Sequence, residues 1–191
     1  MFCTLKEKTQ SLSLPSHILA TLASFAAFRG TQIYLDKLYA ASGHPVDFAT
    51  GQLAFNGEVI FGYYEAMRTG GTFGIYVQTQ LFDFAFIASV IALGVCLGTL
   101  LACVGRGARL TGIGAAFFAF TGGTFDALEN LMSFYLMQFE QGIPHVLALI
   151  YSSFAALKFA SLTAAMVLVL CAVLMGLISG GMRLMHRSTV A

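Results

Sequence analysis

The sequence predicts an all-α polytopic membrane protein, with four transmembrane helices in an antiparallel bundle and an exterior re-entrant or surface-lying segment between the first two. Three observations predict this fold. The 191 residues are 58% hydrophobic and only 10% charged, whereas soluble domains carry about 25% charged residues. The apolar runs are long enough for several spans of about 20 residues each. Basic residues gather in the segments that would lie on one side of the membrane.

This composition excludes a soluble enzyme and leaves room for one integral membrane domain over residues 1–191. The chain has 10 Lys and Arg residues against 9 Asp and Glu residues, so it has no basic surface for nucleic acid. The expected partners are therefore the lipid bilayer, a lipid-like ligand, and a membrane protein partner or a second copy of the chain.

The first span is predicted over about 14–35. Pro15 fits its first turn, because a missing N–H there leaves no helical hydrogen bond unmade. Lys6 and Lys8 ahead of a short apolar run are also typical of a signal segment. A retained span is favoured because the helical pattern continues past Arg29 and no small-x-small cleavage site ends it. The alternative is a three-span chain whose first segment is cleaved or lies on the membrane surface.

Residues 36–75 form the predicted exterior segment. Glycines recur through it, together with Pro45 and the run Gly70-Gly71-Thr72, among aromatic and acidic residues. The segment is too interrupted for a full span and too apolar for a solvated loop. The sequence therefore predicts that it lies on the surface or re-enters the membrane, with a short helix near 56–68.

The other three spans are predicted over about 76–104, 110–137 and 146–182. A tight basic turn at 105–109 joins the second span to the third, and the helix-breaking Pro144 precedes the fourth. The fourth span is longer than a bilayer requires, so it is either tilted or begins outside the hydrocarbon.

The positive charges predict the orientation, because short loops rich in Lys and Arg stay in the cytoplasm. Six cations fall on one side of the four spans: Lys6, Lys8, Arg106, Arg109, Arg183 and Arg187. Both termini are therefore expected in the cytoplasm, and the expected location is the inner (plasma) membrane of a bacterium.

Five ionisable side chains interrupt the spans: Arg29, Asp83, Asp126, Glu129 and Lys158. Each is costly in hydrocarbon unless it is paired or faces a wet cavity. A rise of 1.5 Å per residue brings all of them to about the same depth, in the exterior half of the bundle. The sequence therefore predicts a buried layer in which two cations pair with three carboxylates.

The densest part of this layer lies in the third span. Asp126, Glu129 and Asn130 stand at i, i+3 and i+4, so they share one helix face, with Ser133 one turn further. The residues expected opposite them, or beside them from the exterior segment, are Gln78, Gln80, Asp83, Tyr151, Lys158, Tyr63, Tyr64, Glu65 and Arg68. This is where a bound molecule is expected.

A structural interpretation is open for the same residues. Asp126, Glu129 and Asn130 with a buried cation could serve to fix helix register. Arg29 could extend its guanidinium to the membrane interface. Glu65 and Arg68, one turn apart, are typical of a solvated pair on a helix.

The segment from Phe125 to Asn130, following the Phe82-Asp83-Phe84-Ala85-Phe86 stretch of the second span, carries the motif D-x-x-E-N. In this it resembles small, uncharacterised bacterial membrane proteins of four predicted spans with a similar motif in the third. The resemblance covers about residues 50–140. It implies four helices and a shared polar centre, and it implies no activity.

The chemistry expected of the chain is limited by the motifs it lacks. It has no G-x-S-x-G, H-E-x-x-H or phosphate-binding loop, and no Ser or Cys is paired with a nearby His. No cofactor is expected. No metal site is expected either, because Asp83, Asp126 and Glu129 have no nitrogen ligand beside them.

The favoured hypothesis is a non-catalytic integral membrane protein, either an accessory subunit of a membrane complex or a binder of a lipid-like molecule. One alternative is a membrane enzyme acting on a lipid or isoprenoid, with Asp126 or Glu129 as general acid-base and Arg68 or Lys158 holding an anionic head group. The other is a small proton- or ion-coupled transporter with Asp83, Asp126 and Glu129 as its relay.

Overall fold

The computed structural model describes residues 13–104 and 106–188, and the regular secondary structure of this part of the chain is entirely α-helical. The all-α prediction is therefore confirmed. The helices are α2 (Leu14–Ala41), α3 (Phe48–Gln52), α4 (Gly57–Thr69), α5 (Phe73–Ala102), α6 (Arg106–Leu136) and α7 (His145–Ser188).

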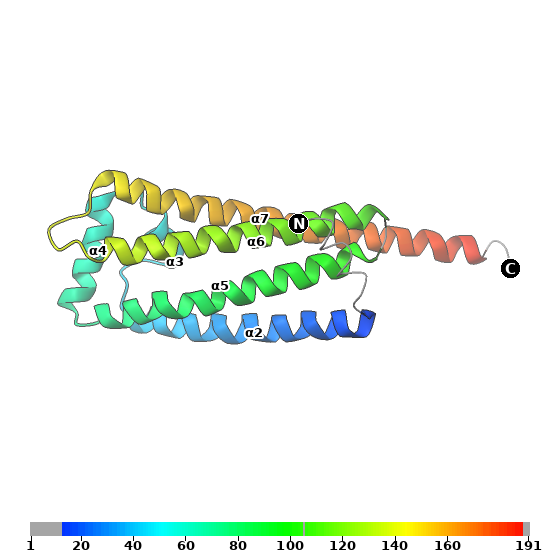
Figure 1. The fold of residues 1–191 in the computed structure, drawn as a ribbon, viewed down its shortest axis with the longest axis horizontal. Coiled ribbons are helices and arrows are strands. Elements are labelled where there is room, and N and C mark those ends of the chain that lie inside the picture. Colours follow the sequence, from blue (N-terminus) through cyan, green and yellow to red (C-terminus); the bar gives the residue numbers. More distant parts are fainter. Residues whose placement is uncertain (1–12, 105, 189–191) are drawn as a thin grey trace.

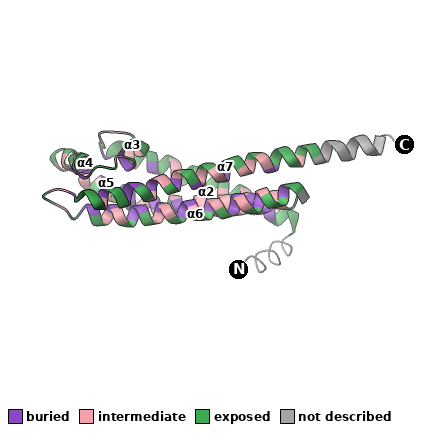
Figure 2. Ribbon diagram, turned by 90° about the horizontal axis from the view of Figure 1, so that it is seen from above, coloured by how far each residue is buried: buried purple, intermediate pink, exposed green. Residues whose placement is uncertain are grey.

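The four long helices, α2, α5, α6 and α7, run alternately up and down and pack in chain order (Figure 1). α2 packs against α5, α5 against α6, and α6 against α7. The short helices α3 and α4 lie at one end of the row, and α7 continues beyond its neighbours at the other end (Figures 1 and 2). We call the end that carries α3 and α4 the α4 end.

Two of the long helices meet the length and composition expected of a membrane span. They are α5, over Phe73–Ala102, and the His145–Ile178 part of α7. α2 is continuous to Ala41, six residues beyond the predicted limit of the first span at about residue 35. The segment predicted to be exterior is therefore shorter than 36–75, because its first residues extend the helix.

Local sequence signals account for the helix at the α4 end. The Asn56 side chain caps α4 by accepting hydrogen bonds from the backbone N–H groups of Glu58 and Val59. Glu58 in the first turn and Arg68 in the last turn both complement the helix dipole. After the helix, Gly71 turns the chain into α5 with a φ of 70°, which favours glycine. The short helix predicted near 56–68 is present.

α2 has no strongly apolar face, and a row of polar contacts holds it against α5. The contacting residues of α2 are seven apart, so they form one stripe along the helix. The side chains of His17 and Thr99 lie 2.9 Å apart, as do those of Thr31 and Ser89. The Ser24 hydroxyl lies 3.7 Å from the Cys96 sulfur. Such hydrogen bonds between helices suit an apolar environment, where packing of small and polar residues replaces the hydrophobic effect.

Glycines bring α5 and α6 into close contact. A Cβ atom added to Gly98 would lie 2.6 Å from the Gly112 carbonyl oxygen and 2.8 Å from the Ala116 nitrogen. A Cβ atom on Gly112 would lie 2.5 Å from the Gly98 oxygen. These positions therefore require glycine, which allows two helix backbones to approach closely.

At the α4 end, α4 covers the bundle through an apolar and aromatic core. Ile60, Tyr64 and Met67 of α4 are buried against Tyr76 of α5 and Leu136 of α6. These three side chains of α4 are almost inaccessible to solvent. Their burial along one helix face therefore holds α4 against the bundle. This packing fixes the position of the segment that carries α3.

His44 gives this end a pH-dependent element. Its ring stacks on Tyr39 at 5.2 Å, and its Nδ1 lies 3.0 Å from the Val46 carbonyl oxygen. Burial lowers the pKa of His44 below the ordinary value. At a pH below the ordinary histidine pKa of about 6.5, the unfolded chain therefore binds more protons at this position than the folded chain.

We expect stability to fall as the pH is lowered from about 7 towards the depressed pKa of His44. In His44→Phe, which keeps an aromatic ring beside Tyr39, this fall should be smaller. Melting temperatures in detergent between pH 8 and pH 5 measure the difference. His145→Gln, which removes an exposed histidine, is the control and should follow the original protein. Identical pH profiles for the original protein and His44→Phe would contradict the assignment.

Candidate functional site

Seven buried polar side chains gather where α5, α6 and α7 meet α3. We call this group the polar centre, and its members are Gln52, Gln80, Asp83, Asp126, Glu129, Asn130 and Lys158. Each is at most 5% exposed. Groups of this kind are stable in a low-dielectric interior only when they bind one another or a ligand.

Lys158 is the cation of the polar centre. Its Nζ atom lies 2.9 Å from Asp126 Oδ1, 2.5 Å from Glu129 Oε2 and 2.9 Å from Gln52 Oε1. A lysine ammonium has three N–H donors, so all of them are used. The spacing of i and i+3 on α6 presents both carboxylates to α7. Gln52 of α3 supplies the third acceptor.

Asp83 joins α5 to the same face of α6. Its Oδ2 atom accepts a hydrogen bond of 2.8 Å from Asn130 Nδ2. Asp126, one turn before Asn130, is close enough to act electrostatically on Asp83. One face of α6 therefore contacts two helices at once. Asn130 binds Asp83 of α5, whereas Asp126 and Glu129 bind Lys158 of α7. Asp126 also acts electrostatically on Asp83.

Tyrosine hydroxyls surround the polar centre on the side of α4. Gln80 Nε2 donates to the Tyr76 hydroxyl at 2.7 Å, and the hydroxyls of Tyr64 and Ser133 lie 3.3 Å apart. Burial raises the pKa of Tyr64 well above its ordinary value. Its hydroxyl is therefore protonated at neutral pH. Tyr151 of α7 lies beside Glu129.

The polar centre holds more negative than positive groups. In the described part of the chain, three carboxyl groups (Asp83, Asp126 and Glu129) are buried with one ammonium group, that of Lys158. If all are ionised, two negative charges have no buried counter-charge. Excess charge of this kind is expensive in a low-dielectric interior, so a stable centre needs either protons on its carboxyl groups or a further cation.

Several atoms of the polar centre also lack a hydrogen-bond partner. Within residues 13–104 and 106–188, the buried side-chain atoms without one are Gln52 Nε2, Gln80 Oε1, Glu129 Oε1 and Asn130 Oδ1. Three are acceptors and one is a donor. Buried polar atoms are normally satisfied by protein groups, ordered water or a ligand, so these four atoms are the ones available to another molecule.

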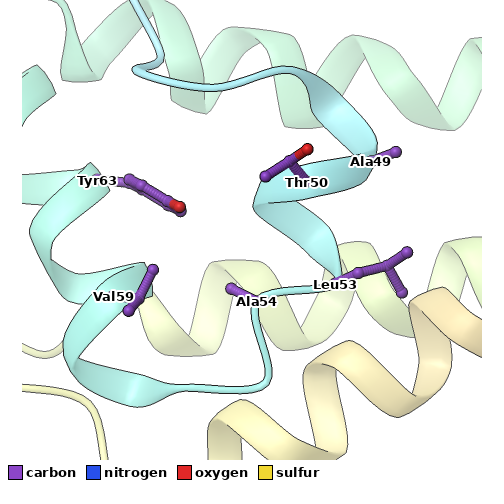
Figure 3. Close-up of a pocket in the computed structure, with 6 residues that line it drawn as sticks. All are labelled: Ala49, Thr50, Leu53, Ala54, Val59 and Tyr63. Carbon is purple, nitrogen blue, oxygen red and sulfur yellow. The ribbon is translucent and has the colours of Figure 1, made fainter.

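An open hollow of about 480 Å³ lies between α4 and the segment formed by α3 and the residues that follow it. Figure 3 shows Thr50 and Ala54 on one side of it and Val59 and Tyr63 on the other. Thr50 belongs to the same five-residue helix as Gln52, which binds Lys158 on the inner side. α3 therefore supplies side chains to both the hollow and the polar centre.

The structure brings together most of the residues predicted in the third span and opposite it. Asp83 and Asn130 form one hydrogen-bonded pair, and Lys158 binds Asp126 and Glu129 in a second group beside it. Gln80 also belongs to the polar centre, and Tyr151, Tyr64 and Ser133 border it.

The predicted place of Arg29 in this layer is wrong. Arg29 is exposed on α2, and its guanidinium binds the side chain of Gln32 one turn away. The stripe of α2 that faces α5 contains His17 and Thr31, and a helical rotation of about 100° per residue turns Arg29 well away from it. Gln78 is likewise exposed on α5, so it does not face the polar centre.

Glu65 and Arg68 lie outside the polar centre, on the surface of α4. They form an ion pair of 2.7 Å in which Glu65 remains 45% exposed. The Arg68 guanidinium also donates to the carbonyl oxygens of Met137 and Phe139, at 2.9 and 3.3 Å. The ion pair within one helix agrees with the structural interpretation of the two residues, and the contacts of Arg68 also attach α4 to the chain that follows α6.

Gln52 is a member of the polar centre that no sequence pattern indicated. It lies in a segment with no regular apolar period, and its position inside the protein depends on the fold of α3. Asp47 caps this helix by accepting from the Thr50 N–H at 3.0 Å. An Asp at that spacing from a Thr is a signal for a helix start, but it does not reveal which side of so short a helix is buried.

Two further findings bear on the chemistry of the site. In the described residues, no group of three or more His, Cys, Asp or Glu side chains is arranged to hold a metal ion. Comparisons with family models, curated proteins and solved structures find no match to this chain. The site is therefore interpreted from its own residues.

Proposed function

We propose that this chain is a non-catalytic integral membrane protein of four spans that binds a lipid-like molecule at its α4 end. The spans would be α2, α5, α6 and the apolar part of α7. Two of these meet the requirements of a span by length and composition. α2 and α6 have similar lengths of 28 and 31 residues, and they pack beside α5 along its length.

We further propose that the α4 end faces the exterior and that both termini lie in the cytoplasm of a bacterium, at its inner membrane. Support comes from the charge distribution, because the basic turn before Leu110 lies at the opposite end from α4 (Figure 1). Arg183 and Arg187 follow the apolar part of α7 on that same side.

The observation that carries the binding function is that one short helix, α3, contributes residues to both the hollow and the polar centre. A lipid-like molecule has an apolar body and a polar head. The hollow offers apolar side chains such as Leu53 and Val59. The polar centre offers unpartnered atoms, including Glu129 Oε1 and Asn130 Oδ1. Binding sites commonly combine an apolar lining with a few polar groups in this way.

The geometry favours binding over acid-base catalysis. Asp126 and Glu129, the candidate general acid and base, both bind the Lys158 ammonium. An ammonium held in this way keeps both carboxylates engaged, and Gln52 occupies its third donor. The atoms left to bind a head group therefore include the second carboxylate oxygen of Glu129 and the amide oxygen of Asn130.

Native mass spectrometry tests this function. The protein is extracted from its own membrane in a mild detergent, and bound molecules are identified by mass. We expect a stoichiometric lipid-like companion in the original protein and its loss in Thr50→Trp, because the larger side chain fills the hollow. Thr124→Trp, at an exposed position of α6, is the matched control and should keep the companion.

Two outcomes would contradict the proposed binding. One is a protein without any bound molecule, and the other is equal retention of the companion in both tryptophan variants. A stoichiometric companion polypeptide in place of a small molecule would instead assign the chain as an accessory subunit.

A further inference from the structure

The charge and hydrogen-bonding capacity of the polar centre define the head group that it fits. This inference rests on the proposed binding of a lipid-like molecule and names the chemistry of that molecule. Among the described residues, Lys158 is the one buried ammonium facing Asp83, Asp126 and Glu129. A neutral or anionic head group would leave the excess negative charge in place, whereas a cationic one would reduce it.

The unpartnered atoms agree with the charge. Glu129 Oε1, Asn130 Oδ1 and Gln80 Oε1 are all acceptors, and Glu129, Asn130 and Gln80 have no measurable exposure. The second polar atom of two of these side chains is already bound within the centre: Glu129 Oε2 binds Lys158, and Asn130 Nδ2 binds Asp83. A group complementary to these three atoms therefore needs several donors, and Gln52 Nε2 is the one unpartnered donor of the polar centre.

A primary ammonium group has this combination, with three N–H donors and one positive charge. A hydroxyl or a carboxylate lacks either the charge or the donors. A metal ion is not favoured, because the described acidic side chains do not converge to hold one. The body attached to the ammonium would be apolar, because the adjoining hollow is lined by residues such as Leu53, Ala54 and Val59.

We propose that the polar centre binds the primary ammonium head of an apolar amine, which enters at the α3–α4 hollow and binds between Asp83, Glu129 and Asn130. The ammonium would be the second cation of the centre, beside Lys158. Gln52 would move with α3 during entry, because it belongs to the helix that lines the hollow and its side chain binds Lys158.

Melting temperatures in detergent test this assignment with dodecylamine as the probe. At about a hundredfold excess over Kd, we expect the melting temperature to rise by roughly 5–10 °C. Dodecanol, which has the same chain and no charge, should raise it much less. Butylamine, which has the charge and a short chain, should also raise it much less if the apolar body contributes to binding.

Variants of the polar centre provide the second part of the test. Asp83→Asn keeps the shape of the side chain and removes one negative charge, so the rise with dodecylamine should fall to the level of dodecanol. Glu129→Gln is a second variant of the same design, in case Asp83→Asn does not fold. Glu58→Gln removes an exposed carboxylate at the same end and should keep the full rise.

Any other result would contradict the amine proposal, the proposed lipid-like binding, or both. Equal rises with dodecanol and dodecylamine would contradict the ammonium assignment and leave lipid-like binding standing. No rise with either probe would contradict both proposals. If protons alone stabilise the protein at pH 5 and dodecylamine adds nothing at any pH, the missing positive charge is a proton and the amine proposal is wrong. A full rise in Asp83→Asn and Glu129→Gln would place the amine elsewhere.

Discussion

Replacing Lys158 by Met is expected to destabilise the protein by about 3–5 kcal/mol, the cost typical of removing one partner from a buried ion pair. The ammonium binds Asp126, Glu129 and Gln52 within 2.9 Å. Met has a similar length and no charge, so the two carboxylates would remain buried without their cation. The free energy of unfolding, measured by denaturant titration in detergent, gives the size of the effect.

A compensating variant separates the ion pair from simple packing. In the triple substitution Asp126→Asn, Glu129→Gln and Lys158→Met, no uncompensated charge remains in this part of the centre. We expect it to recover most of the stability lost in Lys158→Met, as replacement of a whole buried ion pair often does. Lys37→Met, at an exposed position of α2, is the surface control. Equal stability of Lys158→Met and Lys37→Met would show that Lys158 does not hold the polar centre together.

Replacing Gly98 by Ala is expected to cost about 1–3 kcal/mol, because one added carbon atom overpacks the contact between α5 and α6. The new Cβ atom would meet the Gly112 oxygen at 2.6 Å and the Ala116 nitrogen at 2.8 Å. Both are backbone atoms, so no side-chain rotation relieves the contact and the helices must separate. The same denaturant titration measures the loss.

Gly30→Ala is the matched control for this substitution. Gly30 lies within α2, and nothing lies within 4 Å of the position that its Cβ atom would take. Alanine also has the higher helix propensity, so Gly30→Ala should not lose stability. A loss of similar size in both variants would mean that the close contact of α5 with α6 is not what makes Gly98 necessary.

The depth of each charged residue could be predicted from the sequence. Counting residues along each predicted span brings Asp83, Asp126, Glu129 and Lys158 to one level, and the structure joins these four side chains in one cluster. The helical spacing of Asp126, Glu129 and Asn130 also predicts their common face. Depth and spacing follow from the regular rise of a helix, so they need no knowledge of packing.

The direction in which each helix faces could not be predicted in the same way. Arg29 has a depth that suits the layer, but α2 contacts α5 through small polar side chains such as Thr31 and turns Arg29 outwards. α2 has no apolar face from which its rotation could be inferred. Gln78 was misplaced for the same reason, because α5 is apolar on nearly every side.

The contribution of α3 depends on tertiary structure alone. Gln52 reaches Lys158 across 106 residues of sequence, and no local pattern relates the two. The hollow beside Thr50 likewise forms only when α3 and α4 pack at the same end. The charged residues of the polar centre could therefore be predicted from the sequence, whereas the contribution of α3 could not.

The four-span arrangement is the premise of every proposal above, and labelling of single cysteines in intact cells tests it most directly. All four native cysteines are first replaced, because Cys103 is exposed. Single cysteines are then introduced at Thr50, Gln141 and Arg109, and a membrane-impermeant maleimide is added from outside. Four spans with an exterior α4 end predict labelling at positions 50 and 141, with position 109 labelled only after lysis. Labelling of position 109 in intact cells together with position 50 would contradict the arrangement.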